Sequence, residues 1–249
     1  MSARNISLEY TDLGGGAAAQ LSEADRRQLG FKNAERIQQA ITAKLEKKAL
    51  LWMAEHMPAG INSDHLTALG FAAQFLAGVT YALARFSPRW LLATNFFIVL
   101  NWFGDSLDGT LARVRDQQRP RYGFYVDHII DTFGAAFLMG GLAVSGYLHW
   151  SVAVAMLVAF LMVSIEVYLA TYTLGQFRLS YGKFGPTELR IALCAGNIAL
   201  IYKPWAHVLG YPVRLFDFGG AVATAGMLGI MIVSAIRHTA QLYREERLG

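Results

Sequence analysis

Two short segments of the sequence carry pairs of aspartates at helical spacings. Asp105 and Asp108 lie three residues apart, and Asp127 and Asp131 lie four residues apart. On a helix, either spacing places both carboxylates on one face. Each pair also lies at the end of a long apolar stretch, and only a short connection separates the two stretches. A single aspartate at such a place is usually a solvated cap, but four at these spacings predict that the carboxylates converge on one site.

Four carboxylates in a small volume repel one another unless they are protonated or bind cations. Ligand sets made only of oxygen favour Mg²⁺, Mn²⁺ or Ca²⁺ over zinc, which prefers cysteine and histidine. Mg²⁺ in particular is usually shared between a few carboxylates and the phosphates of a substrate. The four aspartates therefore predict a divalent-cation site suited to chemistry on a phosphoanhydride.

The residues between the two aspartate pairs fit a phosphate-binding role. Gly109 lacks a Cβ and would let a bulky group approach the first helix, and Ala112 extends that opening by about one turn. Gly123 would open the facing helix in the same way. Arg113 carries a planar guanidinium that can pair with phosphate oxygens. We therefore expect a nucleotide or phosphate pocket beside the carboxylates.

The whole segment from Asp105 to Asp131 resembles the signature of the CDP-alcohol phosphotransferase family. That signature is Asp-x2-Asp-Gly-x2-Ala-Arg, a spacer, and then Gly-x3-Asp-x3-Asp, and all of its specified residues are present. The spacer, residues 114–122, is one residue longer than the commonest form. Because the extra residue lies in the connection between two helices, we expect it to change only the path of the loop.

The resemblance implies an enzyme that moves a phosphoalcohol or phosphatidyl group from a CDP-linked alcohol to a hydroxyl acceptor and releases CMP. The four aspartates would hold two divalent ions, Mg²⁺ or Mn²⁺, that bridge to the CDP pyrophosphate. The nucleotide and phosphate pocket would be lined by Gly109, Ala112, Arg113 and Gly123. The resemblance also implies a homodimer.

Two residues compete for the role of general base. The resemblance assigns it to Asp131, although a carboxylate that also binds metal is a weak base. His128 stands beside Asp127 in the pattern Asp-His-x2-Asp, which resembles the choline and ethanolamine phosphotransferase branch of the family. An imidazole titrates near neutral pH and suits proton transfer. The sequence leaves both catalytic candidates open.

Composition indicates that these segments lie in a membrane protein. Apolar residues make up 54% of the chain and charged residues only 16%, and the charges crowd into the first sixty residues and a few short segments. Such a distribution is typical of membrane spans. We expect an all-α integral membrane bundle of six transmembrane helices, near residues 66–85, 90–112, 124–147, 150–174, 187–203 and 215–236.

The rest of the chain would flank this bundle. We expect a flexible tail over 1–20, an amphipathic helix over 21–60 in the cytosol or at the membrane surface, the catalytic domain over 61–240, and a cytosolic tail over 241–249. With the N-terminus in the cytosol, 18 of the 22 lysines and arginines lie on that side, as the positive-inside rule requires. The predicted protein is multi-pass, in the cytoplasmic membrane if bacterial, with its active site facing the cytosol.

The partners follow from the same distribution. Basic residues lie at the ends of apolar stretches, where lipid headgroups would be, so we expect membrane lipids and no nucleic acid. The donor and acceptor stay open between CDP-diacylglycerol with a small polar alcohol and a CDP-aminoalcohol with a lipid alcohol. His128 favours the second pair, and the basic segment 178–190, which could hold a phosphorylated acceptor, favours the first.

Two further alternatives stay open. A metal- or proton-coupled transporter would also carry carboxylates within the membrane. However, all four aspartates lie at one edge and the sequence has no internal repeat, which disfavours a transporter. Glu166 lies within an apolar stretch and could line an acceptor pocket with Tyr168 and Thr171, or could pair with Arg190 or a tyrosine.

Overall fold

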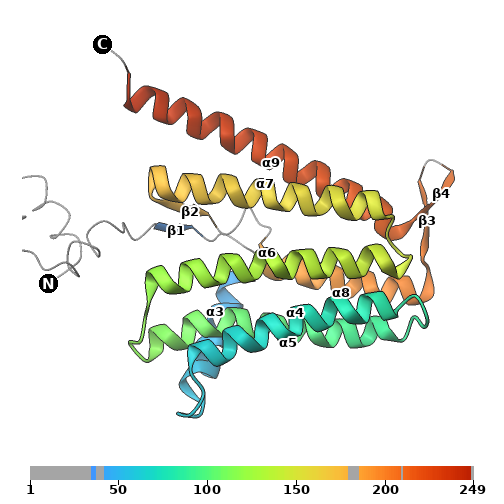
Figure 1. The fold of residues 1–249 in the computed structure, drawn as a ribbon, viewed down its shortest axis with the longest axis horizontal. Helices are drawn as coiled ribbons and strands as arrows, with labels where there is room; N and C mark the ends of the chain where they lie inside the picture. The colour runs from blue at the N-terminus through green and yellow to red at the C-terminus, as the bar shows by residue number, and fades with distance from the viewer. Residues whose placement is uncertain (1–34, 38–41, 179–184, 209, 248–249) are drawn as a thin grey trace, which may run out of the picture. The chain divides into compact units, whose positions relative to one another are not determined.

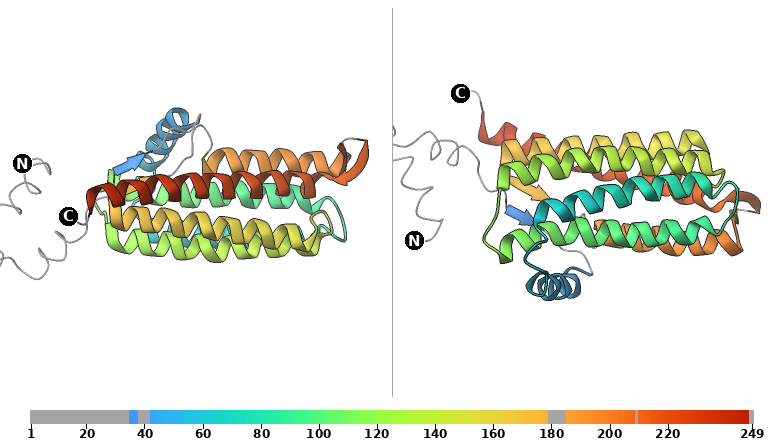
Figure 2. Two further views of the ribbon diagram at one scale, coloured as in Figure 1. Left: turned by 90° about the horizontal axis from the view of Figure 1, so that it is seen from above. Right: turned by 60° about the horizontal axis from the view of Figure 1, so that its bottom comes forward.

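The computed structural model describes residues 35–37, 42–178, 185–208 and 210–247. Most of these residues are helical, and helices α4 to α9 run lengthwise beside one another in the views of Figures 1 and 2. The helices are α3 (Ala43–Glu55), α4 (Ser63–Leu83), α5 (Trp90–Val114), α6 (Pro120–Ser145), α7 (Trp150–Leu174), α8 (Pro186–Tyr202) and α9 (Leu215–Glu245).

Two short pairs of strands lie at opposite ends of the helices (Figure 1). Strand β1 (Glu35–Ile37) pairs in parallel with β2 (Gln176–Arg178), which directly follows α7. Strands β3 (Trp205–Val208) and β4 (Tyr211–Arg214) form an antiparallel hairpin between α8 and α9. The turn of this hairpin contains Gly210, whose φ of 87° favours glycine.

The all-α membrane fold is confirmed, and each predicted apolar stretch coincides with one helix from α4 to α9. Among the described residues, four helices are long and apolar enough to cross a membrane: α4, α6, α7 and α9. Helix α8 has only 17 residues, and the C-terminal part of α5 carries the polar residues of the first aspartate pair. The number of six spans therefore stays a prediction.

The N-terminal amphipathic helix predicted over residues 21–60 is only partly present. Helix α3 covers Ala43–Glu55, with Leu50 and Ala54 buried and the three lysines at 44, 47 and 48 exposed. The prediction of a continuous helix is wrong at β1, because the backbone of these residues pairs with β2, which is far away in the sequence. The predicted tail over 1–20 and the start of the predicted helix, as far as residue 34, lie outside the described residues.

Helix α4 makes backbone contacts with both neighbouring helices through glycines. A Cβ at Gly104 of α5 would lie 2.6 Å from the amide nitrogen of Gly70 in α4. A Cβ at Gly141 of α6 would overlap the carbonyl oxygen of Gly78 in α4. Small residues allow helices in membranes to approach closely, where van der Waals packing and not the hydrophobic effect holds them together. Helix α4 thereby holds α5 and α6, which carry the two aspartate pairs, on its surface.

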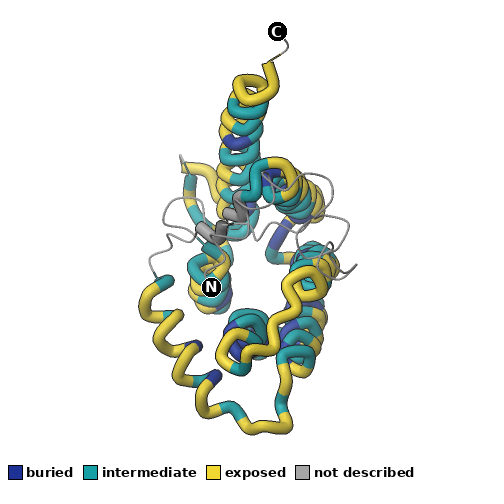
Figure 3. Tube along the Cα trace, turned by 90° about the vertical axis from the view of Figure 1, so that its left-hand side faces the viewer, coloured by how far each residue is buried: buried dark blue, intermediate teal, exposed yellow. Residues whose placement is uncertain are grey.

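Buried apolar side chains form one cluster near each end of the helices. One cluster joins α3, α4 and α5 through Leu50, Leu66, Leu107 and other residues. The second, near the β3–β4 hairpin, includes Tyr81 and Leu142. Away from these clusters, the outward faces of the helices are largely exposed, as Figure 3 shows. That exposure suits lipid contact, because apolar side chains need no protein cover there.

Replacing Gly141 by alanine is expected to lower the free energy of unfolding by about 1–3 kcal/mol, because the added methyl group overlaps backbone that cannot move independently. Gly140→Ala is the matched control, since a Cβ at the neighbouring Gly140 meets no atom within 4 Å. Thermal unfolding in detergent measures both variants. Equal melting temperatures for the two would contradict the close α4–α6 packing.

Candidate active site

The two aspartate pairs lie in the halves of α5 and α6 that adjoin the connection between these helices, and Figure 1 shows this end of the bundle. Asp105 and Asp108 lie in the C-terminal half of α5, and Asp127 and Asp131 lie in the first half of α6. The carboxylate of Asp131 is close enough to those of Asp105 and Asp108 for their charges to interact. The structure therefore brings carboxylates of both helices together, on the side of each helix that faces its neighbours.

Arg190 of α8 neutralises one of these carboxylates. Its Nη2 donates to Asp105 Oδ2 over 2.5 Å, and its Nε donates to Asn101 Oδ1 over 3.1 Å. Asn101 in turn donates to the carbonyl oxygen of Gly70. The side chains of Arg190 and Asp105 are only 18% and 26% exposed, so solvent and salt screen their attraction less than that of a surface ion pair. The sequence showed Arg190 at a helix start, but no local pattern identified its partner.

Thr67 of α4 orients Asp108. Its hydroxyl donates to Asp108 Oδ2 over 2.6 Å, while the other carboxylate oxygen lies 2.5 Å from the amide nitrogen of Gly109. Thr67 lies in the first turns of α4, a helix whose start is capped by reciprocal hydrogen bonds between Asn62 and His65. The sequence gives Thr67 no distinct role, because a threonine near a helix start has many other uses.

The small residues leave the helix surfaces beside the aspartates open. A Cβ at Gly109 would meet only the Nη1 of Arg113 within 4 Å, at 3.6 Å, and one at Gly123 would meet nothing. Ala112 is partly exposed. Arg113 is exposed and donates from its Nη2 to the hydroxyl of Thr110 over 3.0 Å. These positions leave room for a ligand beside the carboxylates.

His128 is packed between two aromatic rings. Its ring stacks on Phe124 with a centroid distance of 4.1 Å and meets Tyr168 of α7 edge-on at 4.6 Å. Its Nδ1 lies 3.6 Å from Asp127 Oδ2, and the side chain is only 12% exposed. Tyr168 also lies near the carboxylates of Asp127 and Asp131. Helix α7 thus closes one side of the site, and the packing of His128 fits a structural role.

The donor set suits a hard divalent cation, because it consists of carboxylate oxygens. In the arrangement of the described side chains, however, no three His, Cys, Asp or Glu residues are placed to hold one ion together. Asp105 is directed to Arg190 and Asp108 to Thr67. Arg190 contacts one carboxylate oxygen of Asp105, so a metal ion at Asp105 would share this carboxylate with Arg190 or displace it, and the metal ligands stay a prediction.

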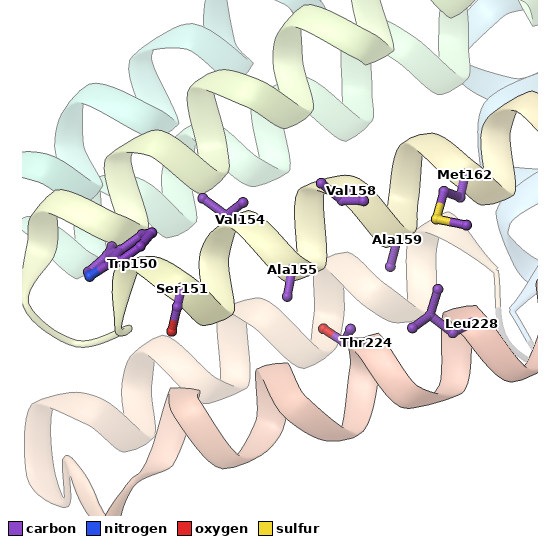
Figure 4. Close-up of a pocket in the computed structure, with 9 residues that line it drawn as sticks. All are labelled: Trp150, Ser151, Val154, Ala155, Val158, Ala159, Met162, Thr224 and Leu228. Atoms are coloured by element: carbon purple, nitrogen blue, oxygen red, sulfur yellow. The ribbon is translucent and has the colours of Figure 1, made fainter.

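Two other features differ from the aspartate cluster. Glu166 of α7 has its Oε1 2.6 Å from Nδ1 of His238 in α9, whereas Arg190, one of the two alternative partners considered for it, pairs with Asp105. A groove of about 380 Å³ between α7 and α9 lies nearer the other end, beside the N-terminal half of α7 (Figure 4). It is lined almost entirely by apolar side chains such as Val154, Val158 and Leu228, and offers little to a phosphate.

Comparison with known proteins identifies the family. A model of the CDP-alcohol phosphatidyltransferase family matches residues 61–216, which include α4 to α8 and all four aspartates. The chain belongs to this family. It is also 30% identical over 105 residues to an archaetidylinositol phosphate synthase of Pyrococcus horikoshii, a match that covers 42% of this chain and 53% of that protein. The chain thus spans about half the length of the curated relative. Membership of a transferase family gives no support to the transporter alternative.

Arg190→Gln is expected to destabilise the protein by about 1–3 kcal/mol in EDTA, because it leaves the carboxylate of Asp105 without its cation beside other carboxylates. Millimolar Mg²⁺ is expected to recover most of this loss, since an ion that binds only the folded state stabilises it. Thermal unfolding with and without Mg²⁺ measures both effects.

Arg121→Gln serves as the control, because Arg121 is an exposed arginine at the same end of the bundle. If Mg²⁺ raised the melting temperature of the wild type and of both variants equally, the ion and Arg190 would not share Asp105.

Proposed function

We propose that the protein is a phospholipid-synthesising transferase that moves a phosphatidyl or phosphoalcohol group from a CDP-alcohol to a hydroxyl acceptor and releases CMP. The observation that carries the proposal is the convergence of Asp105, Asp108 and Asp131 inside the region that matches the family. The clustered carboxylates lie beside open helix surfaces at one end of a membrane bundle, where a lipid and a water-soluble substrate can meet.

The reaction forms one bond and breaks one. The acceptor oxygen attacks the phosphorus that carries the alcohol of the donor, the anhydride bond breaks, and CMP leaves with the bonding electrons. The proton of the acceptor hydroxyl goes to a general base, for which we propose Asp131. An alcohol is a poor nucleophile at neutral pH, so a base within hydrogen-bond reach is needed.

The same residues would bind the donor. Asp105, Asp108, Asp127 and Asp131 would hold two Mg²⁺ or Mn²⁺ ions, which when bound would offset the charge of the pyrophosphate and of the leaving CMP. Gly109, Ala112 and Gly123 would leave room for the nucleotide and its phosphates. Arg113 would contact a phosphate oxygen, for which its exposed guanidinium is suited.

For the substrates, we propose a CDP-linked lipid as donor and a small phosphorylated alcohol as acceptor. The relative from Pyrococcus horikoshii is named for a phosphorylated inositol lipid, archaetidylinositol phosphate. Arg190 supports this choice, because a guanidinium released from Asp105 by a metal ion would be available to an anionic acceptor. The stacking of His128 on Phe124 weakens the case for a CDP-aminoalcohol, which rested on that histidine.

The membrane arrangement belongs to the same proposal. We infer a multi-pass protein with its aspartates facing the cytosol, in the cytoplasmic membrane if the source is bacterial, and a homodimer as its assembly. The distribution of lysine and arginine along the chain supports the orientation.

CMP release by the purified protein in nanodiscs with Mg²⁺ or Mn²⁺ tests the proposal. CDP-diacylglycerol with a panel of phosphorylated and unphosphorylated small alcohols is expected to give CMP, whereas CDP-choline or CDP-ethanolamine with diacylglycerol is not. Asp108→Asn and EDTA are each expected to lower the rate by at least about 100-fold, because both remove charge stabilisation of the transition state. Metal-independent release, or none from any donor by folded protein, would overturn the proposal.

Substitutions at the two base candidates separate their roles. Asp131→Asn is expected to lower kcat by about 10²–10⁴-fold, the usual contribution of a general base. His128→Phe preserves an aromatic ring between Phe124 and Tyr168 and is expected to retain at least about a tenth of the activity. The pH dependence of kcat in both variants is the measurement. A larger loss in His128→Phe than in Asp131→Asn would make His128 the base.

A further inference from the structure

Helix α3 precedes the region that matches the family by its sequence, yet it packs against the helices that carry the site. Leu50 and Ala54 of α3 are buried in one apolar cluster with Leu66, Leu107 and Leu111. Leu107 lies between Ser106 and Asp108, so the packing reaches the helix segment that carries the first aspartate pair. The contact is therefore made at the site end of α5.

Glu46 lies one turn before Leu50, on the same face of α3. One of its carboxylate oxygens, Oε1, accepts a hydrogen bond of 2.8 Å from Trp102 Nε1 of α5 and another of 2.8 Å from Thr187 Oγ1 of α8. The Ser106 hydroxyl lies 3.4 Å from the same oxygen. A single carboxylate oxygen thus joins α5 and α8, and hydrogen bonds to a charged acceptor are stronger than neutral ones.

The two helices that Glu46 joins carry the two partners of the ion pair at the site. Trp102 lies three residues before Asp105 on α5, and Thr187 lies three residues before Arg190 on α8. Side chains three apart on a helix share a face. Glu46 therefore holds α5 and α8 at the level of the Asp105–Arg190 contact.

A second glutamate fixes α3 in this place. Glu188 Oε1 accepts hydrogen bonds from the backbone nitrogen of Thr42, at 3.0 Å, and from its hydroxyl, at 2.8 Å. Its other oxygen accepts from the backbone nitrogen of Gly185. Arg115 donates to the carbonyl oxygens of Met57 and Ile61 and so ties the connection after α3 to the end of α5. The register of α3 on the two helices is thus set at both of its ends.

We propose that Glu46 is a positioning residue for the transferase reaction, holding the Asp105–Asp108 segment of α5 and the Arg190 segment of α8 at a fixed separation. The inference rests on the proposed function. If a metal ion and donor weakened or displaced the Asp105–Arg190 contact, that contact would hold the two helices less firmly. The hydrogen bonds of Glu46 do not involve the aspartates, so they persist and keep the carboxylates in place. Displacing catalytic groups by about 1 Å can cost two orders of magnitude in rate.

Kinetics of CMP release by Glu46→Ala, Glu46→Gln and Glu55→Ala test the proposal. Glu46→Ala is expected to lower kcat at least about tenfold and to raise the half-saturating Mn²⁺ concentration, with KM for the donor changed by less than about threefold. Glu46→Gln is expected to stay within about threefold of wild type, because its amide oxygen still accepts both hydrogen bonds. Glu55, exposed on the same helix, is the matched control and should leave kcat unchanged.

A kcat of Glu46→Ala equal to that of Glu55→Ala, per folded molecule, would overturn the proposal. Should Glu46→Ala not fold, Trp102→Phe and Thr187→Val each remove one donor and are expected to show smaller losses in the same direction. Wild-type kinetics in both would again overturn it.

A distance measurement separates this proposal from the proposed function. Spin labels on the exposed residues Val114 and Leu189, in a Cys194→Ser background, report the separation of α5 and α8 without any substrate. A narrow distance distribution is expected for the parent and for Glu46→Gln, and a broader one for Glu46→Ala. If the wild type released no CMP from any donor, the proposed function would fail. The distance distributions would still test whether Glu46 holds α5 and α8 together. Equal distributions for Glu46→Ala and the parent would refute that role.

Discussion

The site depends on how negative charge is balanced at the end of a membrane bundle. Three carboxylates from two helices interact there, in surroundings of lower polarity than water, where like charges repel strongly. The structure offsets this repulsion with Arg190, which comes from a third helix, and with hydrogen bonds from Thr67 and the backbone at Gly109 to Asp108. Removing one member of such a set leaves a buried charge without compensation, so the fold and the site are energetically linked.

The close approach of the helices positions these charges. Glycines at the α4–α5 and α4–α6 contacts permit backbone to touch backbone, so the two helices with the aspartates lie against one central helix. Arg190 is then held by Asn101, which itself donates to the backbone of Gly70 in α4. The polar contacts thus run from α8 through α5 to α4. These side chains satisfy one another's hydrogen bonds, and unsatisfied polar groups cost free energy in a membrane.

The same arrangement has consequences for function. Arg190 supplies positive charge to Asp105, one of the carboxylates that the proposed metal ions would bind. In the proposed function, a metal ion at Asp105 would compete with Arg190 for the negative charge of this carboxylate. The family match, the carboxylate cluster and the open surfaces at Gly109 and Gly123 agree with chemistry on a pyrophosphate at this end of the bundle.

The sequence by itself determined the helices and the candidate carboxylates. Apolar stretches of spanning length and aspartates at spacings of three and four are local properties, and the structure has a helix at each predicted stretch. Local periodicity could not show that residues 35–37 form a strand, because their partner lies near residue 177. Nor could it pair Arg190 with Asp105, Thr67 with Asp108, or Glu46 with both α5 and α8, since those residues are 41 to 141 positions apart. Such contacts depend on which helix faces lie together. Only the tertiary structure decides this, through the packing of α4 against its neighbours, which the glycines permit.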